Sequence, residues 1–185
     1  FLDDDALVPP DWLGYFSTAL RLHPDAGVVG CRVVDKAAPM TVQSVDLFFE
    51  RATVPGPEQG PGKGTVSETH FHANDPDFGQ YGYLRIAASV TGCCHLLTRR
   101  NMDAVGPFDL RFSPPQVYDI ERDVRSCLQG AFPLYQGHLR VRHLKRSGLC
   151  ATQTPWQAAN CAGNAEKLKR SYPEETLLGF TDAIR

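Results

Sequence analysis

The sequence lacks any apolar run near the roughly 20 residues that a bilayer-crossing helix needs. It also lacks a stretch in which positive charge is followed by an apolar segment, as in a secretory leader. Neither sign of charge dominates, because 19 Lys and Arg residues stand against 21 Asp and Glu residues. We therefore expect no nucleic-acid partner. The expected location is the cytoplasm, including the inner face of a membrane.

The cysteines have none of the close spacing that zinc ribbons and redox motifs require. There are 6 of them, and no two form a CxxC pair. Most stand in apolar stretches such as "VTGCCHLL" and "VRSCLQG", where a cysteine acts as a small buried hydrophobe. Reduced thiols are therefore expected, and a disulfide between Cys93 and Cys94 is the less favoured alternative.

The length and composition fit one globular domain over residues 1–185, since the chain is 42% hydrophobic and 22% charged. Its first half predicts a helix in "PPDWLGYFSTALRLHPDAG", starting near Asp11, and a buried strand in "GVVGCRVVD". The apolar residues at helical spacing are Trp12, Leu13, Phe16, Leu20 and Leu22. A further strand in "VQSVDLFFERATV" precedes a flexible loop over residues 54–64, which is rich in Pro and Gly.

The second half predicts an apolar stretch broken at Thr91 and Gly92, then a short helix in "RNMDAVG". A second helix in "YDIERDVRSCLQGAF" ends at Gly130 and buries Ile120, Val124, Cys127 and Leu128. Two short strands, "PLYQG" and "LRVRHLK", and a C-terminal helical segment over residues 152–185 complete the chain. Strands that alternate with helices predict an α/β domain with a mixed sheet flanked by helices.

Three carboxylates open the chain directly behind two apolar residues. We interpret Phe1 and Leu2 as the last residues of a buried strand. We also expect this chain to be part of a longer protein. Ligands gather at the carboxyl ends of strands in open α/β sheets, and Mg²⁺ and Mn²⁺ prefer oxygen ligands. Asp3 and Asp5 are therefore candidate metal ligands, whereas Asp4 caps the following helix or is solvated.

A second acidic group, Asp119, Glu121 and Asp123, stands where a helix begins, and the helix dipole favours anions there. The simpler alternative is a charged first turn in which Arg125 pairs with Glu121 at four residues' spacing. His143 is a third candidate, and its simpler alternative is a surface or packing histidine.

The order and spacing of these segments resemble the family 2 glycosyltransferases, the inverting group with the GT-A fold, over most of the chain. "FLDDDALVPPDWL" is similar to the DxD segment of that family at a strand end. "VTGCCHLLTRRNMDAVGPFDLRF" is similar to its apolar strand, Thr-Gly turn, short helix and Gly-Phe-Asp turn. "YDIERDVRSCLQGAF" resembles its acidic helix, and "LRVRHLKRSG" resembles the late strand that brings a histidine to the metal.

The resemblance implies a partial GT-A (Rossmann-like) domain that lacks the nucleotide-binding strands preceding the DxD segment. It implies transfer of a sugar from a nucleoside-diphosphate donor to a glycan, lipid-linked or protein acceptor, with Mn²⁺ or Mg²⁺ as cofactor. The implied metal ligands are Asp3, Asp5 and His143, and the implied general base is Asp119. Substrate binding is expected at Asp4, Thr91, Gly92, Glu121 and Arg125, with Gly92 letting the ligand approach the backbone.

Two departures and two rivals accompany this interpretation. Tyr118 stands where the family often has Glu, and residues 43–89 have no match residue by residue. One rival is a zinc-type metallohydrolase in which His70 and His72 alternate on a strand near Asp75. The other is a glycosyltransferase-like module without chemistry. A truncated sheet also predicts self-association through the face where its missing part packs.

Overall fold

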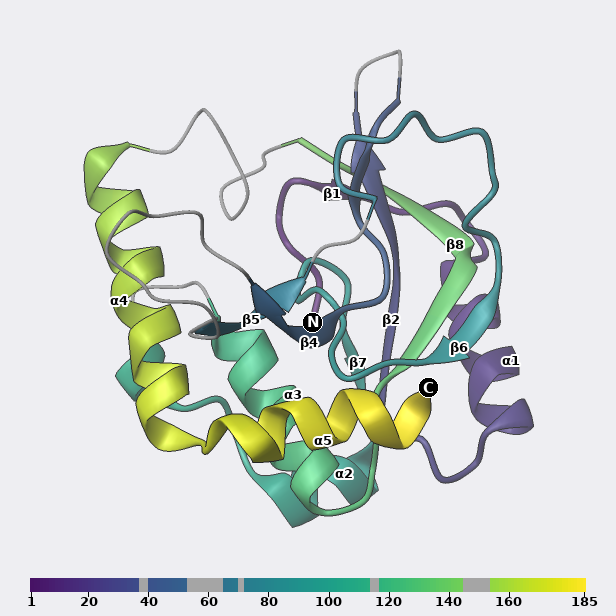
Figure 1. Ribbon diagram of the computed structural model, residues 1–185. Coiled ribbons are helices and arrows are strands. Elements are labelled where there is room, and N and C mark those ends of the chain that lie inside the picture. Colours follow the sequence, from purple (N-terminus) through teal and green to yellow (C-terminus); the bar gives the residue numbers. More distant parts are fainter. Residues whose placement is uncertain (37–39, 53–64, 70–71, 114–116, 145–153) are drawn as a thin grey trace.

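Two parallel strands, β2 (Val28–Asp35) and β8 (Leu134–His143), form the centre of the main sheet (Figure 1). A computed structural model describes residues 1–36, 40–52, 65–69, 72–113, 117–144 and 154–185. The predicted strand "GVVGCRVVD" is confirmed as β2. All of its residues from Val28 to Val34 are buried, as expected of a strand that is covered on both faces.

The remaining strands run antiparallel to this pair, so the sheet is mixed. They are β1 (Ala6–Leu7) and β6 (Leu84–Ile86) on β8, and β3 (Val42–Ser44) and β7 (Leu96–Leu97) on β2. A separate antiparallel hairpin consists of β4 (Phe48–Ala52) and β5 (Thr65–Thr69). The α/β class with a mixed sheet flanked by helices is therefore confirmed.

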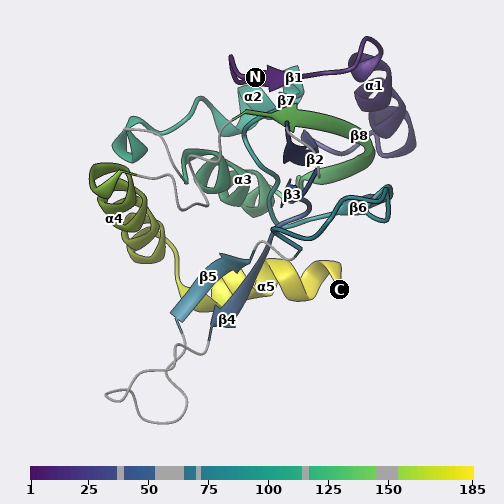
Figure 2. The same ribbon diagram turned by 90° about the horizontal axis from the view of Figure 1, so that it is seen from above.

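The helices lie on both sides of the central strands (Figures 1 and 2). They are α1 (Trp12–Leu22), α2 (Arg99–Val105), α3 (Tyr118–Leu128), α4 (Pro155–Ser171) and α5 (Glu174–Ile184), and a 3₁₀ turn spans Leu110–Phe112. Helix α1 packs Phe16 and Ala19 against β2 and β8. On the other side, α3, α4 and α5 enclose a second apolar cluster that includes Phe49.

Helix α5 also completes the hairpin. The hydroxyl of Thr181 accepts a hydrogen bond from the backbone N–H of Phe49 at 2.9 Å and donates one to the Phe49 carbonyl at 2.9 Å. One side chain of the helix thus satisfies both backbone groups of a strand residue.

Several predicted boundaries are confirmed. Helix α1 begins directly after Asp11, and α3 is followed by Gly130, whose φ of 75° suits a residue without a Cβ. The prediction that α3 buries four apolar residues is right for Ile120, Val124 and Cys127, but Leu128 is 50% exposed.

The predicted C-terminal helical segment is two helices rather than one. Helix α4 starts with a capping box, in which Thr154 and Gln157 exchange hydrogen bonds around Pro155. It ends at Ser171, and the following Tyr172 is extended (φ -133°, ψ 129°) because the ring of Pro173 disfavours the helical conformation for the residue before it. Residues 152 and 153 lie outside the described part of the chain.

Two strand predictions are wrong in opposite ways. "VQSVDLFFERATV" contains β3 and β4 in different sheets, because the chain leaves β2 after Ser44. "PLYQG" and "LRVRHLK" form the single strand β8. The strand does not end at Gly137 but continues through a β-bulge. Cys31 of β2 pairs with Gln136, and the next residue of β2 pairs with Arg140.

Phe1 is 63% exposed and Leu2 is 42% exposed, and Leu2 forms only an isolated bridge with Cys94. The prediction that these residues end a buried strand is therefore wrong. Among the described cysteines, Cys31, Cys93, Cys94 and Cys127 are free thiols. The predicted flexible loop over residues 54–64 lies outside the described residues. Across the described helices, none combines the length and apolar character needed to cross a membrane.

Candidate functional site

The chain start is fastened beside the carboxyl end of β8. The backbone N–H of Asp3 donates to the Cys93 carbonyl at 2.9 Å, and Leu2 bridges to Cys94. Strand β1 then pairs Ala6 with His143, the last residue of β8. Asp3 and Asp5 therefore flank the carboxyl end of β8, and not the end of a buried strand of their own as the sequence predicted.

His143 points between these two carboxylates. Its Nε2 lies 3.0 Å from Asp5 Oδ1 and 3.5 Å from Asp3 Oδ2. The histidine side chain is 10% exposed, that of Asp5 is 15% exposed and that of Asp3 is 41% exposed, so the group opens to solvent on the Asp3 side. His143 is therefore not a surface histidine, a packing role for it is not contradicted, and the three predicted metal ligands come together.

A buried amide fixes the proton of His143. Gln43 Nε2 donates to Asp35 Oδ1 at 2.8 Å and to the His143 carbonyl at 3.2 Å, which turns Gln43 Oε1 toward His143 Nδ1 at 2.9 Å. Because Oε1 only accepts, Nδ1 must carry a proton. Its Nε2 therefore faces two carboxylates either as a second N–H or as a lone pair. Histidines that bind metals usually have such a partner on the other ring nitrogen.

The charge balance of this group favours a cation. Burial raises the pKa of Asp3 above its usual value of 3.8, and the neighbouring carboxylates of Asp5, Asp119 and Asp4 raise it further, whereas His143 lowers it. One imidazole thus stands against several acids in a partly desolvated place. Such an excess of carboxylate is relieved by a proton or by a metal ion.

Cys93 is a member of this group that the sequence did not single out. Its sulfur, one carboxylate oxygen of Asp3 and one ring nitrogen of His143 all lie within 4.8 Å of one another. Burial, with Asp3 and Asp5 nearby, raises the pKa of the Cys93 thiol well above its usual value. Its position directly after Gly92 in the Thr-Gly turn was the only available signal.

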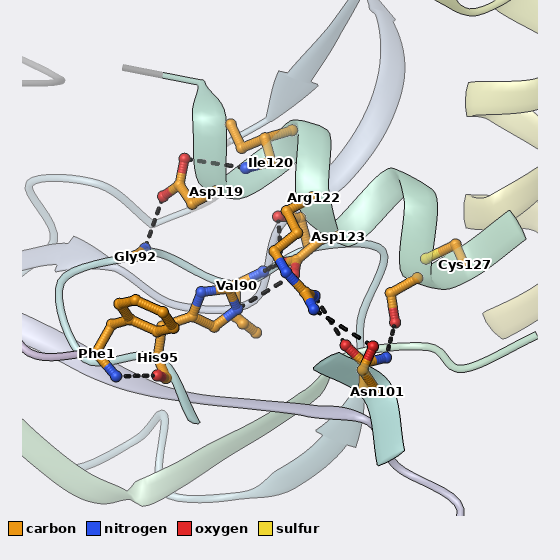
Figure 3. Close-up of polar contacts among 12 residues, drawn as sticks. Phe1, Val90, Gly92, His95, Asn101, Asp119, Ile120, Arg122, Asp123 and Cys127 are labelled. Atoms are coloured by element: carbon orange, nitrogen blue, oxygen red, sulfur yellow. Dashed lines mark hydrogen bonds and ion pairs between the residues drawn. The ribbon is translucent and has the colours of Figure 1, made fainter. Parts of the chain in front are cut away.

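Asp119 begins α3 on the other side of the same turn (Figure 3). Its Oδ2 accepts a 2.6 Å hydrogen bond from the Gly92 N–H, and its Oδ1 accepts one of 2.9 Å from the Ile120 N–H. Burial raises its pKa, and His95 together with these N–H donors lowers it. The carboxylate is half-buried and close enough to Asp3 for the two charges to interact.

The predicted reason for Gly92 needs correction. A Cβ at this residue would lie 2.8 Å from Asp119 Oδ2 and 3.0 Å from Asp119 Cβ. Glycine is therefore required because the Asp119 side chain approaches the turn at this point, and a bound ligand is not needed to explain it. Thr91 is half-buried in the same turn, and Asp4 is exposed and caps no helix.

Tyr118, which replaces the Glu often seen in the resembled family, packs its ring edge-on against Phe108 at 5.3 Å between centroids. Phe108 in turn contacts Phe1 at 4.8 Å. This aromatic group borders Asp119 and supplies no second carboxylate at that place.

Glu121 and Arg125 form the predicted ion pair, in which the carboxylate is buried and the arginine is partly exposed. Glu121 is 1% exposed; Arg125 Nε donates to its Oε1 at 2.9 Å, and the Tyr172 hydroxyl donates to Oε1 at 2.7 Å. Arg125 also donates to the carbonyls of Val105 and Pro107. These contacts fasten α3 to the ends of α2 and α4, and substrate binding by either residue stays a prediction.

Asp123 and His95 form a buried pair that sequence reasoning missed (Figure 3). Asp123 Oδ2 accepts hydrogen bonds from the Ser89 hydroxyl at 2.8 Å and the Val90 N–H at 2.9 Å, and Oδ1 lies 3.2 Å from His95 Nε2. Both side chains are 0% exposed. The pair holds the segment before Gly92 against α3, which indirectly positions Asp119.

The zinc site proposed by the rival interpretation is not supported by the described residues. His72 does not alternate on a strand, because β5 ends at Thr69 and His72 adopts a positive φ of 68° in a turn. Its Nδ1 pairs with Asp75 Oδ2 at 3.2 Å, and the Tyr81 hydroxyl donates to the same oxygen. His70 lies outside the described residues.

Comparison of the chain with models of known protein families gives no match, and neither does comparison with curated proteins.

Proposed function

We propose that this chain carries the metal and acceptor side of an inverting, GT-A-type glycosyltransferase similar to family 2. It transfers a sugar from a nucleoside-diphosphate donor to an acceptor hydroxyl. The observation that carries the proposal is the convergence of Asp3, Asp5 and His143 beside Asp119. These residues come from three segments far apart in the chain, and the resemblance gives them their roles.

The cluster fits Mn²⁺ or Mg²⁺ by donor type and spacing. Adjacent donors around an octahedral Mg²⁺ lie about 3 Å apart, because its metal–oxygen bonds are about 2.1 Å long. The separations of 3.5 Å and 3.0 Å between His143 Nε2 and the carboxylate oxygens of Asp3 and Asp5 are similar. Carboxylate oxygens suit either ion, and the imidazole favours Mn²⁺. When bound here, the cation offsets negative charge on the departing diphosphate.

Asp119 is the proposed general base, which accepts the proton of the acceptor hydroxyl. Its Oδ2 is held by the Gly92 N–H, which fixes the direction of the carboxylate without neutralising it. Its raised pKa makes it a stronger base than a solvated Asp, and it acts only when ionised. Activity therefore rises with pH through the pKa of Asp119.

The first test is Mn²⁺ binding to the 185-residue chain, followed by the loss of the electron paramagnetic resonance signal of free Mn²⁺. We expect Asp5→Asn to weaken binding by about tenfold or more, as loss of a ligand should. Asp11→Asn is the matched control, because Asp11 is exposed and its side chain caps nothing. Equal Mn²⁺ affinity in Asp5→Asn and the wild type would overturn the proposed site.

A panel of nucleotide sugars then tests the chemistry. Mn²⁺-dependent release of one nucleotide identifies the donor, and Asp119→Asn is expected to abolish release while Mn²⁺ binding persists. Persistence of release in Asp119→Asn removes its role as base. No release and no nucleotide binding, in a Mn²⁺-binding protein that includes the nucleotide-binding strands which the resemblance implies upstream of Phe1, count against the transferase.

A second candidate is a module that binds partners, including a second copy of itself, without chemistry. It is favoured by exposed apolar side chains along the β1 edge, where Phe1, Leu2 and Leu7 are 63%, 42% and 39% exposed. Sedimentation of the wild type and of Leu7→Lys tests this candidate. Association that Leu7→Lys removes supports it, and a wild type that stays monomeric contradicts it.

A further inference from the structure

The acidic group beside β8 contains one soft ligand among its hard ones. Cys93 Sγ lies with an oxygen of Asp3 and a ring nitrogen of His143 inside a 4.8 Å group. Mg²⁺ gains little from a sulfur ligand, whereas Zn²⁺ and related thiophilic ions prefer a combination of thiolate, imidazole and carboxylate. The composition of the group therefore extends beyond what a Mn²⁺ or Mg²⁺ site needs.

The three donors are held by backbone contacts. Asp3 is tied directly to Cys93 by the N–H to carbonyl bond of 2.9 Å, and the neighbouring residues Leu2 and Cys94 form a bridge. His143 ends β8, where it pairs with Ala6. Cys93 and His143 are buried, and Asp3 is the more exposed member. A cation can thus reach the group from solvent and meet a preformed set of ligands.

The remaining ring nitrogen of His143 is already occupied by Gln43, and Gln43 is fixed by Asp35. This arrangement leaves His143 Nε2 as the ligand atom, as in metal sites whose second ring nitrogen has a partner. The 3.5 Å between Nε2 and Asp3 Oδ2 is close to the separation of two donors on a tetrahedral Zn²⁺, about 3.4 Å for bonds near 2.1 Å.

We propose that Asp3, Cys93 and His143 form a binding site for a thiophilic divalent cation of the Zn²⁺ class, with a fourth position open to water. The Cys93 proton passes to solvent when the cation binds, because the thiolate is the ligand. The site shares Asp3 and His143 with the proposed Mn²⁺ site but uses Cys93 in place of Asp5. The two ions therefore compete, and the inference does not require transferase activity.

Co²⁺ is the probe, since it replaces Zn²⁺ and its bond to a thiolate gives a charge-transfer absorption band. Titration of the reduced 185-residue chain is expected to give this band with saturation at one equivalent. Cys93→Ser should remove it, and Cys161→Ser should keep it, because Cys161 lies on α4 and outside the group. Absence of the band in the wild type, or its persistence in Cys93→Ser, overturns the proposal.

Two further variants complete the test. Should Cys93→Ser not fold, Asp3→Asn serves instead and is expected to weaken Co²⁺ binding by about tenfold, and unchanged binding contradicts the site. Asp5→Asn separates this site from the proposed function, since it should lose Mn²⁺ binding but keep the Co²⁺ band. Excess Zn²⁺ should abolish the band by displacement, and a band that resists Zn²⁺ contradicts a shared site.

Discussion

The two acidic segments of this chain contain the same residue type but use it differently. In the first segment, Asp3 and Asp5 crowd around one imidazole and remain partly open to solvent. In the second, Glu121 and Asp123 are buried, and each is bonded by several donors of the protein itself. The first has carboxylate to spare for a cation, and the second uses its carboxylates to join segments.

Asp119 lies between these two cases. It belongs to the second segment by sequence, yet its charge interacts with Asp3 and it is only half-buried. The number of protein donors that bond a carboxylate therefore distinguishes an acid that joins segments from one that remains available to a ligand, and its place in a motif does not.

Asp123→Asn should lower the free energy of unfolding more than any other substitution considered. It places an amide where a carboxylate accepts from Ser89, Val90 and His95, so a buried donor loses its acceptor. We expect the free energy of unfolding to fall by about 3–5 kcal/mol, as when a buried pair is broken. Urea denaturation measures it, with the exposed Asp25→Asn as control. A loss no larger than that of the control would place Asp123 with the first segment.

Gly92→Ala tests the contact that brings Asp119 to the turn. The new Cβ would lie 3.0 Å from the Asp119 Cβ, which cannot rotate away, so α3 or the turn must shift. A loss of about 1–3 kcal/mol in the free energy of unfolding is expected.

The matched control is Gly163→Ala in α4, where nothing lies within 4 Å of the added Cβ. A helical Ala should there stabilise the chain by about 0.5–1 kcal/mol. Equal effects of the two substitutions would contradict the close approach at Gly92.

Tyr172→Phe sharpens the assignment of Glu121 to the fold. It removes the 2.7 Å hydrogen bond to Glu121 Oε1 but leaves the ion pair with Arg125. The expected loss is about 1–2 kcal/mol in the free energy of unfolding, with Mn²⁺ binding unchanged. Weaker Mn²⁺ binding in this variant would connect the two segments more closely than the structure does.

The pH dependence of stability places Asp119 between the segments. Because burial raises its pKa in the folded state, the folded protein holds this proton more tightly than the unfolded chain does. The stabilising contribution is present below the unfolded value of 3.8 and is lost as pH rises through the folded pKa. Asp119→Asn should therefore gain stability relative to the wild type as pH rises from about 4.

Urea denaturation of both proteins across this range measures the difference, and Gly163→Ala should keep the wild-type slope because it changes no ionisable group. A constant difference between Asp119→Asn and the wild type would show that this carboxylate is solvated like a surface acid.

The sequence predicted the elements whose pattern is local. Helix α1, strand β2 and helices α2 and α3 follow from apolar spacing and from Pro and Gly at their ends. The metal role of Asp3 and Asp5 stays a prediction. The continuity of β8 was not predictable, since the bulge at Gly137 depends on its pairing with β2.

The supports of the site were also hidden. Gln43 reaches His143 only because β3 pairs with β2, which in turn pairs with β8, and no local pattern records such a register. His95 and Asp123 are likewise far apart in the chain and looked like an ordinary apolar stretch and a charged turn. Their roles come from tertiary contacts that periodicity does not encode.

The contact between Thr181 and Phe49 has a consequence for solubility and for biosynthesis. An isolated two-stranded hairpin is marginally stable, and its unpaired edge is a template for another chain. The Thr181 hydroxyl occupies both backbone groups of Phe49, so α5 blocks intermolecular strand addition there. Thr181 lies 132 positions after Phe49 in the chain. During synthesis the edge of β4 is thus unprotected until α5 has emerged from the ribosome. In that interval the exposed edge is a binding site for a chaperone.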